Sequence, residues 1–266
     1  MYRKHFGLTR HLIGNDIPHD ELFVANSTRE AEIRIEHLIK LRGMGLLTGE
    51  AGSGKTTAGR KVVGALHEGL YRVFYVPLST GNVMDTYKSI GWEMGLPVSR
   101  NRAAAYRTIR AEVTRLCHEA KKSPILIIDD AHHLRNDVLE DLRLLTCYGM
   151  DSDNRLCLLL IGLTEIRRRL RMAVHESLEQ RLIVKHHLGG LQRDELGAYL
   201  IYHLRRCGTE LPLFCPEAEE ALFAASNGLL RKVNRYAHYA LLAAAVDKKK
   251  GVEAPHVEQA LKEVGP

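Results

Sequence analysis

The chain has 266 residues, of which 45% are hydrophobic and 26% charged, and its formal net charge at pH 7 is +6. This composition is typical of an ordinary globular protein that forms one large domain, or a main domain with a smaller one. Its longest apolar stretch, residues 156–161, is too short to cross a bilayer, and the N-terminus has no apolar signal core. We therefore expect a cytoplasmic protein without membrane contact.

Cysteine spacing and charge distribution indicate which kinds of site and ligand the protein has. The five cysteines show no paired C-x-x-C spacing, which favours reduced thiols over disulfides or a zinc site. Residues 1–189 contain 28 Lys or Arg and 22 Asp or Glu, whereas residues 190–266 contain ten of each. The positive field therefore belongs to the first part, where it favours binding of a polyanion.

Five apolar runs predict strands, and segments with helical periodicity separate them. The runs lie at residues 45–48, 73–77, 125–129, 156–161 and 182–187. Because strands that alternate with helices form parallel sheets covered on both faces, we predict an α/β fold with a five-stranded parallel sheet flanked by helices.

Beyond Gly189-Gly190 the strand pattern stops and four helical patterns follow. They lie at about residues 193–207, 217–226, 230–249 and 255–264. We predict that residues 1–189 form an α/β nucleotide-binding domain with an N-terminal linker. Residues 190–266 are expected to form a small all-helical lid domain.

A glycine-rich motif follows the first predicted strand, since residues 49–56 read G-E-A-G-S-G-K-T. Its glycines let backbone N–H groups converge on phosphates, and the N-terminus of the next helix favours an anion. Lys55 adds a positive charge and Thr56 offers a hydroxyl to Mg²⁺. We predict a phosphate-binding loop (P-loop) for ATP and Mg²⁺, formed by Gly49, Glu50, Ala51, Gly52, Ser53, Gly54, Lys55, Thr56 and Thr57.

The third predicted strand ends in two carboxylates. Residues 125–130 read I-L-I-I-D-D, which is the Walker B pattern. We expect Asp129 to hold Mg²⁺ together with Thr56, and Asp130 to orient or deprotonate the attacking water. Paired aspartates also occur as solvated strand ends or helix caps, and the upstream P-loop is what favours the catalytic interpretation.

Nearly the whole chain resembles the AAA+ ATPases, and within them the group typified by the general secretion pathway A protein and by transposition-associated ATPases. Shorter matches support the P-loop and Walker B motifs: F-G-L at 6–8, L-F-V at 22–24, S-T-R-E-A at 27–31, I-G at 161–162, Q-R at 180–181, N-G at 227–228 and R-K-V-N at 231–234. The resemblance implies a P-loop NTPase fold that hydrolyses ATP. Proteins of this group usually have glutamate after the Walker B aspartate, so the shorter Asp130 predicts slow hydrolysis.

The resemblance also implies roles for three further residues. Arg231 matches the sensor 2 arginine that reaches the γ-phosphate, and Arg181 matches the arginine finger that acts in a neighbouring subunit. Thr164 is a weaker candidate for sensor 1. Either arginine could instead form a surface ion pair. If Arg181 acts across subunits, a monomer is incomplete, and we expect a homo-oligomer in the form of a ring or helical filament.

A basic helix is predicted from about residue 103. Residues 100–122 contain seven Lys or Arg against two Glu, and an apolar stripe at 3- and 4-residue spacing leaves the basic residues on the opposite face. Such a face is also ordinary for a surface helix. The resemblance to AAA+ proteins that assemble on DNA favours phosphate contacts by Arg102, Arg107, Arg110 and Lys121.

Two functions from different classes follow. The first is an ATP-dependent regulator that assembles on double-stranded DNA, selects a transposition target and activates a transposase. The second is a secretion-assembly ATPase without a DNA role. Such secretion proteins continue into a membrane span and a peptidoglycan-binding domain, whereas this sequence ends at Pro266, so we expect the DNA function. A small-molecule kinase is disfavoured by the helical lid that carries Arg231.

Overall fold

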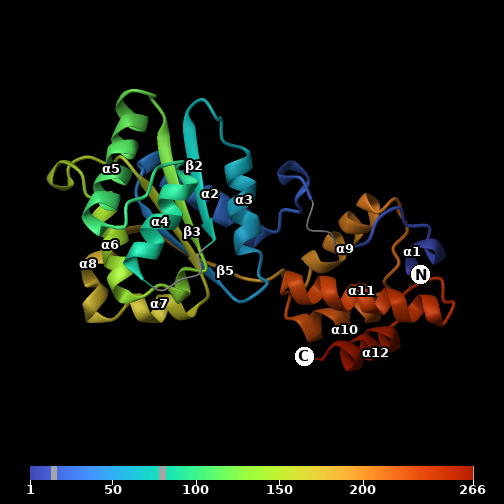
Figure 1. Ribbon diagram of the computed structural model, residues 1–266. Helices are drawn as coiled ribbons and strands as arrows, with labels where there is room; N and C mark the ends of the chain where they lie inside the picture. The colour runs from blue at the N-terminus through green and yellow to red at the C-terminus, as the bar shows by residue number, and fades with distance from the viewer. Residues whose placement is uncertain (13–16, 78–81, 266) are drawn as a thin grey trace. The chain divides into compact units, whose positions relative to one another are not determined.

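The computed structural model describes residues 1–12, 17–77 and 82–265, and one of its two parts is built on a five-stranded sheet (Figure 1). The strand order is β2-β3-β4-β1-β5, and every neighbouring pair is parallel. Each observed strand overlaps its predicted range, which confirms the predicted α/β fold. The strands are β1 (Met44–Gly49), β2 (Tyr71–Pro77), β3 (Ser123–Asp129), β4 (Cys157–Gly162) and β5 (Leu182–Leu188).

Helices pack on both faces of this sheet and bury its central strands β1, β3 and β4 at every position. One face is covered by α2 (Asn26–Leu41) and α3 (Lys55–Gly64), whose apolar side chains pack against β1, β3, β4 and β5. The opposite face is covered by five helices: α4 (Val83–Glu93), α5 (Arg102–His118), α6 (Asn136–Thr146), α7 (Glu165–Leu170) and α8 (Glu176–Glu179). Because parallel strands all point the same way, the ends of β1, β3 and β4 share one edge.

A helical unit with its own core contains the C-terminal part of the chain. Its helices are α1 (Tyr2–His5), α9 (Glu195–Arg206), α10 (Pro216–Ser226), α11 (Leu230–Val246) and α12 (Ala254–Val264). Short 3-10 turns complete the chain: η1 (His19–Glu21), η2 (Ala131–His133), η3 (Gly149–Asp151) and η4 (Ala173–His175). The four predicted C-terminal helices are all present, close to their predicted bounds.

The chain divides into two compact units, and the N-terminal segment belongs to the helical one. That unit comprises residues 1–29, 51–54 and 189–266, and the α/β unit comprises residues 30–50 and 55–188. Tyr2 is 1% exposed, and its hydroxyl contacts Nδ1 of His11 at 3.1 Å and Nδ1 of His238 at 3.2 Å. The boundary predicted at residue 190 places this segment with residues 30–189 instead. A single aromatic anchor of this kind has no periodicity that would reveal its partner.

All five cysteines are free thiols, as their spacing suggests. Across residues 1–12, 17–77 and 82–265, no helix is long and apolar enough to span a membrane.

Candidate nucleotide-binding site

The P-loop connects β1 to α3, and its backbone requires glycine at two positions. Gly52 and Gly54 have φ angles of +83° and +95°, which residues with a side chain rarely adopt. A Cβ on Gly52 would lie 2.5 Å from Cβ of Arg231, and a Cβ on Gly54 would lie 2.8 Å from Cδ1 of Leu230. The backbone N–H of Arg231 donates to the Gly52 carbonyl at 3.1 Å. The loop glycines therefore serve both the turn and the close approach of the first residues of α11.

Lys55 begins α3 and is 9% exposed. Its Nζ donates to the carbonyl oxygens of Gly49 at 3.1 Å and Glu50 at 2.8 Å, which holds the ammonium against the loop backbone. The hydroxyl of Ser53 is buried and has no hydrogen-bond partner within the described part of the chain. A positive charge at a helix N-terminus, left-handed glycines and an unsatisfied hydroxyl fit a bound phosphate chain.

Asp129, the last residue of β3, is 6% exposed and accepts three hydrogen bonds. Its Oδ2 accepts from the hydroxyls of Thr56 at 2.7 Å and Tyr75 at 2.9 Å, while its Oδ1 accepts from the N–H of Asp130 at 2.8 Å. The structure thus brings Thr56 and Asp129 into direct contact. A hydroxyl and a carboxylate are hard oxygen donors, and this pair fits Mg²⁺.

Tyr75 also belongs to this group, although no sequence motif points to it. It lies in β2 opposite Ile127 of β3, two residues before Asp129. Burial, followed by the charge of Asp129, raises the pKa of the Tyr75 hydroxyl well above its usual value. The hydroxyl is protonated at neutral pH, as an ordinary tyrosine is, and it donates to the Asp129 carboxylate. The contact depends on the register between β2 and β3. That register cannot be predicted from a single sequence.

Asp130 follows β3 in a left-handed conformation, with φ +50° and ψ +32°, and its side chain is 64% exposed. Nδ1 of His132 lies 4.0 Å from its Oδ1 and accepts from the N–H of Leu163 at 3.4 Å. Burial, and then the neighbouring His133, lowers the pKa of His132, so the ring is neutral near pH 7. The carboxylate of Asp130 is thus accessible, and no imidazolium shields it. Among the described residues no cluster of His, Cys, Asp or Glu forms a further metal site.

Thr164, the weaker candidate for sensor 1, follows β4 and contacts the P-loop segment. Its hydroxyl donates to Oε1 of Glu50 at 2.9 Å. This hydrogen bond joins the end of β4 to the second residue of the P-loop. The role of Thr164 as a sensor remains a prediction.

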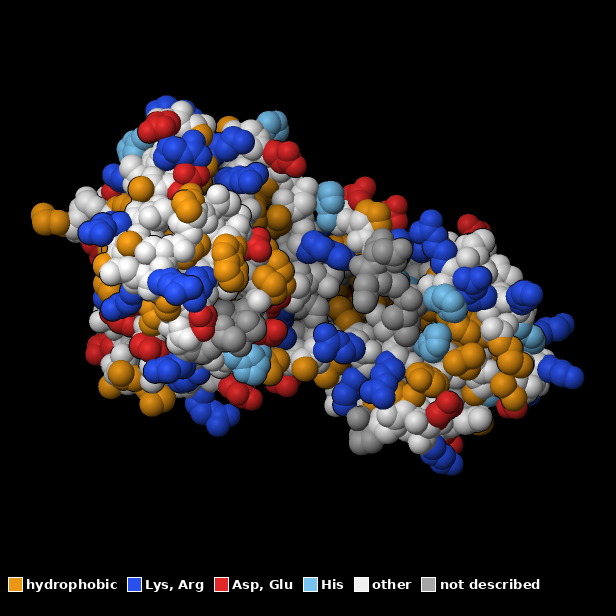
Figure 2. Space-filling model, viewed as in Figure 1, with side chains coloured by type: hydrophobic (Ala, Val, Ile, Leu, Met, Phe, Trp, Pro, Cys, Tyr) orange, Lys and Arg blue, Asp and Glu red, His pale blue; other side chains and the backbone are white. Residues whose placement is uncertain are grey.

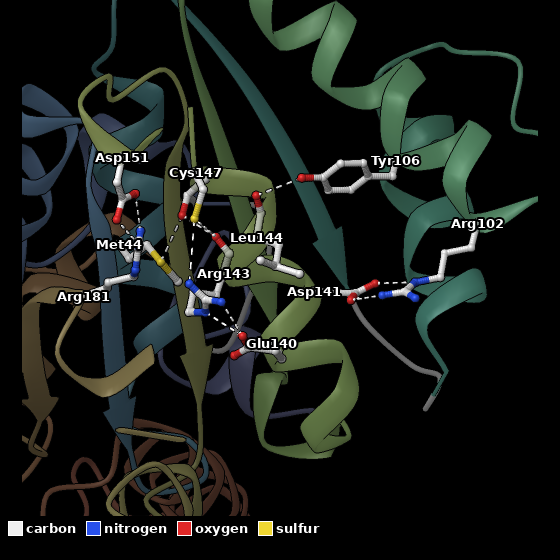
Figure 3. A network of polar contacts seen from close by, with 11 residues as sticks. Met44, Arg102, Tyr106, Glu140, Asp141, Arg143, Leu144, Cys147, Asp151 and Arg181 are labelled. Atoms are coloured by element: carbon white, nitrogen blue, oxygen red, sulfur yellow. Dashed lines mark hydrogen bonds and ion pairs between the residues drawn. The ribbon is translucent and has the colours of Figure 1, made fainter. Parts of the chain in front are cut away.

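Arg181, the predicted arginine finger, lies before β5 and forms a two-point ion pair with Asp151 (Figure 3). Its Nη1 donates to Oδ1 of Asp151 at 2.7 Å, and its Nη2 donates to the other oxygen. The guanidinium lowers the pKa of Asp151. Arg181 is 28% exposed at its side chain, so action in a neighbouring subunit requires it to exchange Asp151 for another anion.

Three of the four predicted DNA contacts lie on α5, Lys121 follows the helix, and two of the four have partners within the α/β unit. Arg102 forms a two-point ion pair with Asp141 of α6 (Figure 3). The Asp141 carboxylate is 4% exposed and also accepts from the hydroxyl of Tyr87 at 2.8 Å. Arg110 donates to the carbonyl of Leu144 at 3.1 Å, and its guanidinium lies 3.9 Å from the ring centroid of Tyr148. Both residues join α5 to α6 and the loop that follows it.

The prediction that Arg110 lies on the exposed face of α5 is wrong. Position 110 is four residues after Tyr106 and three before Val113, so it lies along the same side of the helix as the apolar stripe. Arg107 and Lys121 are exposed and form no ion pair within the described ranges. In Figure 2, Lys and Arg side chains are scattered among acidic and apolar ones over the surface in view, rather than gathered in one patch.

The fold and the site together define a P-loop nucleoside triphosphatase. A P-loop joins β1 to α3, β4 lies between β1 and β3, and Asp129 at the end of β3 contacts the P-loop threonine. Residues 38–170 match the family model of the AAA domain, and the chain belongs to this family. The resemblance inferred from the motifs is thereby confirmed.

Three known proteins show how far the likeness extends. The chain is 30% identical over 247 residues to General secretion pathway protein A of Aeromonas hydrophila, covering 92% of this chain and 45% of that protein. It therefore spans less than half the length of this curated relative. Cdc6p from Pyrobaculum aerophilum has a TM-score of 0.72 at 16% identity, covering 95% of this chain and 70% of that one. The ORC1 protein of Aeropyrum pernix in complex with DNA has a TM-score of 0.69 at 17% identity, covering 95% and 68%. The two solved structures support the fold.

Proposed function

We propose that this chain is a Mg²⁺-dependent ATPase of the cytoplasm whose nucleotide state controls its assembly. The observation that carries the proposal is the 2.7 Å contact between Thr56 of the P-loop and the buried Asp129 of Walker B. Two motifs that lie about seventy residues apart in sequence meet at one point, where a metal bound to phosphates needs its protein ligands.

Each residue has a defined part in this activity. The N–H groups of residues 49–57 and Nζ of Lys55 bind the phosphates, and Thr56 and Asp129 hold the metal. Bound Mg²⁺ neutralises charge on the phosphate oxygens. Asp130 accepts a hydrogen bond from the attacking water and orients it. Because its side chain is one methylene shorter than glutamate, the water is held less well and turnover is slow.

Assembly follows from the two arginines. Arg181 donates to the nucleotide of the neighbouring subunit, and Arg231 acts as the sensor that responds to the γ-phosphate. The contact of the Arg231 backbone with Gly52 supports this role, since it ties the start of α11 to the P-loop. A homo-oligomer, as a ring or a helical filament, is the active form.

Double-stranded DNA is the proposed polymer on which the oligomer assembles, and a transposase is its proposed protein partner. Three observations support DNA: the net charge of +6, the exposed Arg107 and Lys121, and a fold similar to that of ORC1, whose structure is a complex with DNA. The basic surface of α5 is smaller than its sequence suggests, since Arg102 and Arg110 have internal partners. The transposase partner, and the role in selecting a transposition target, rest on the motif resemblance to transposition-associated ATPases.

A secretion-assembly ATPase without a DNA role is the second candidate. The observation that favours it is the 30% identity to General secretion pathway protein A. Because the chain covers 45% of that protein, the shared part supports the ATPase more than the partner.

Electron microscopy of the full chain with a non-hydrolysable ATP analogue, with and without duplex DNA, tests the proposal. We expect rings or filaments that need the analogue and become longer or more numerous with DNA. Assemblies that ignore DNA at low salt would favour the secretion candidate. Single molecules under every condition would contradict nucleotide-controlled assembly.

A further inference from the structure

The hydroxyl of Tyr75 donates to the same carboxylate oxygen, Oδ2 of Asp129, that receives the Thr56 hydroxyl. Tyr75 belongs to the edge strand β2, and its side chain reaches the last residue of the neighbouring strand β3. It is 40% exposed, whereas Asp129 is 6% exposed. An exposed tyrosine of the edge strand therefore donates a hydrogen bond to a buried carboxylate of the next strand.

Tyr75 is not among the buried residues of the core. Phe74 and Val76 of β2 are buried on one face of the sheet, whereas Tyr75 lies on the other face, as do Tyr71 and Val73. A hydrogen bond to an ionised carboxylate is shorter and about twice as strong as one between neutral groups. Its effect at this position is to fix the orientation of Asp129.

The Thr56 hydroxyl has two roles, because it donates to Asp129 and its oxygen is also the predicted metal ligand. Thr56 would therefore both bind Mg²⁺ through its oxygen and donate its hydrogen to Asp129. The Tyr75 hydroxyl is not a predicted metal ligand, and it donates to Oδ2 of Asp129 at 2.9 Å. Groups that hold a metal ligand in this way commonly change metal affinity by about 10- to 100-fold when they are removed.

We infer that Tyr75 is a positioning residue of the metal site, which orients the Asp129 carboxylate for Mg²⁺ and thereby sets the metal dependence of nucleotide binding. This inference rests on the proposed function of the site. It assigns to β2 a part in metal binding that neither the P-loop nor the Walker B motif contains.

The test compares Tyr75→Phe with Tyr71→Phe, a matched control in the same strand. Tyr71 lies opposite Ser123 at the other end of β3, and its ring packs against the α2–α3 side of the core. Both substitutions remove one phenolic oxygen and keep the ring, so they share any general effect on β2. Affinity for a fluorescent ATP analogue is measured for each variant in EDTA and over a range of Mg²⁺ concentrations.

For Tyr75→Phe we expect unchanged affinity in EDTA and a Mg²⁺ half-saturation about tenfold higher than for the wild-type chain, with Tyr71→Phe equal to wild type. A Tyr75→Phe variant with the wild-type Mg²⁺ dependence would overturn the inference, and so would an equal effect in both variants. If the wild-type chain itself binds no nucleotide, the proposed function fails instead. The two failures are therefore distinguishable.

Discussion

The end of β3 and the surface of α5 both carry charged side chains that the sequence marks as functional, yet their surroundings differ. At the end of β3, Asp129 is 6% exposed and is held by Thr56, Tyr75 and the backbone of Asp130. Along α5, charged groups predicted to meet DNA either pair internally, as Arg102 does, or are exposed, as Arg107 is. The spacing of the two motifs therefore predicts which residues form one site. The charge of a helix face does not predict whether each charged side chain already has an ion-pair partner within the protein.

Asp130→Asn tests the β3 end and has the largest expected effect. An amide cannot accept the proton of the attacking water, so turnover should fall by about 10²- to 10⁴-fold, while ATP affinity stays within about twofold. Steady-state hydrolysis and equilibrium binding measure the two quantities. Asp194→Asn, in the helical unit, is the control. Hydrolysis at the wild-type rate would show that another group positions the water.

Arg102→Ala tests whether this arginine of α5 is structural. Its loss leaves the carboxylate of Asp141, which is 4% exposed, with Tyr87 as its remaining side-chain donor. Breaking a buried ion pair costs about 3–5 kcal/mol, and we expect about 1–3 kcal/mol here because the Arg102 side chain is 62% exposed and water can partly replace it.

Urea unfolding measures this change in the free energy of unfolding. Arg107→Ala is the matched control on the same helix and should change it by less than about 0.5 kcal/mol. Equal destabilisation by the two substitutions would contradict the distinction between them.

Charge reversal of Arg107 and Lys121 tests whether the accessible part of this surface binds DNA. The double substitution to Glu should weaken duplex binding about tenfold or more and reduce the salt dependence of the affinity. Lys250→Glu with Lys262→Glu lowers the net charge equally and serves as the control, because both lysines are exposed in the helical unit. Equal losses in the two double variants would mean that binding follows net charge alone.

Asp151→Asn has the smallest expected effect and concerns the ion pair of Arg181. Weakening this exposed pair should release Arg181 for a neighbouring subunit and raise turnover of the assembled protein by about two- to fivefold. Hydrolysis is measured at several protein concentrations, since a subunit-subunit effect grows with assembly. Reduced turnover in the variant would show that Asp151 supports the active arrangement of Arg181 instead of competing for it.

Features that depend on a local sequence pattern could be predicted from the sequence. All five strands and the four C-terminal helices lie close to their expected bounds, because apolar runs and helical periodicity are local properties. The proximity of Thr56 and Asp129 also follows, since both motifs end at the same edge of a parallel sheet.

Three features required the folded structure. Tyr75 depends on the β2–β3 register, and Tyr2 depends on a partner more than two hundred residues away. Arg110 lies on the apolar side of α5, although its charge suggests the exposed side, because its planar guanidinium packs on the rings of Tyr106 and Tyr148.

Calorimetric titration of ATP with Mg²⁺ into the wild-type chain and into Lys55→Ala most directly tests the claim that residues 49–57 and the end of β3 form one nucleotide site. The account predicts one ATP bound per wild-type chain, and an affinity at least about a hundredfold weaker, or no detectable binding, for Lys55→Ala. Equal affinity of the two proteins for ATP would contradict it.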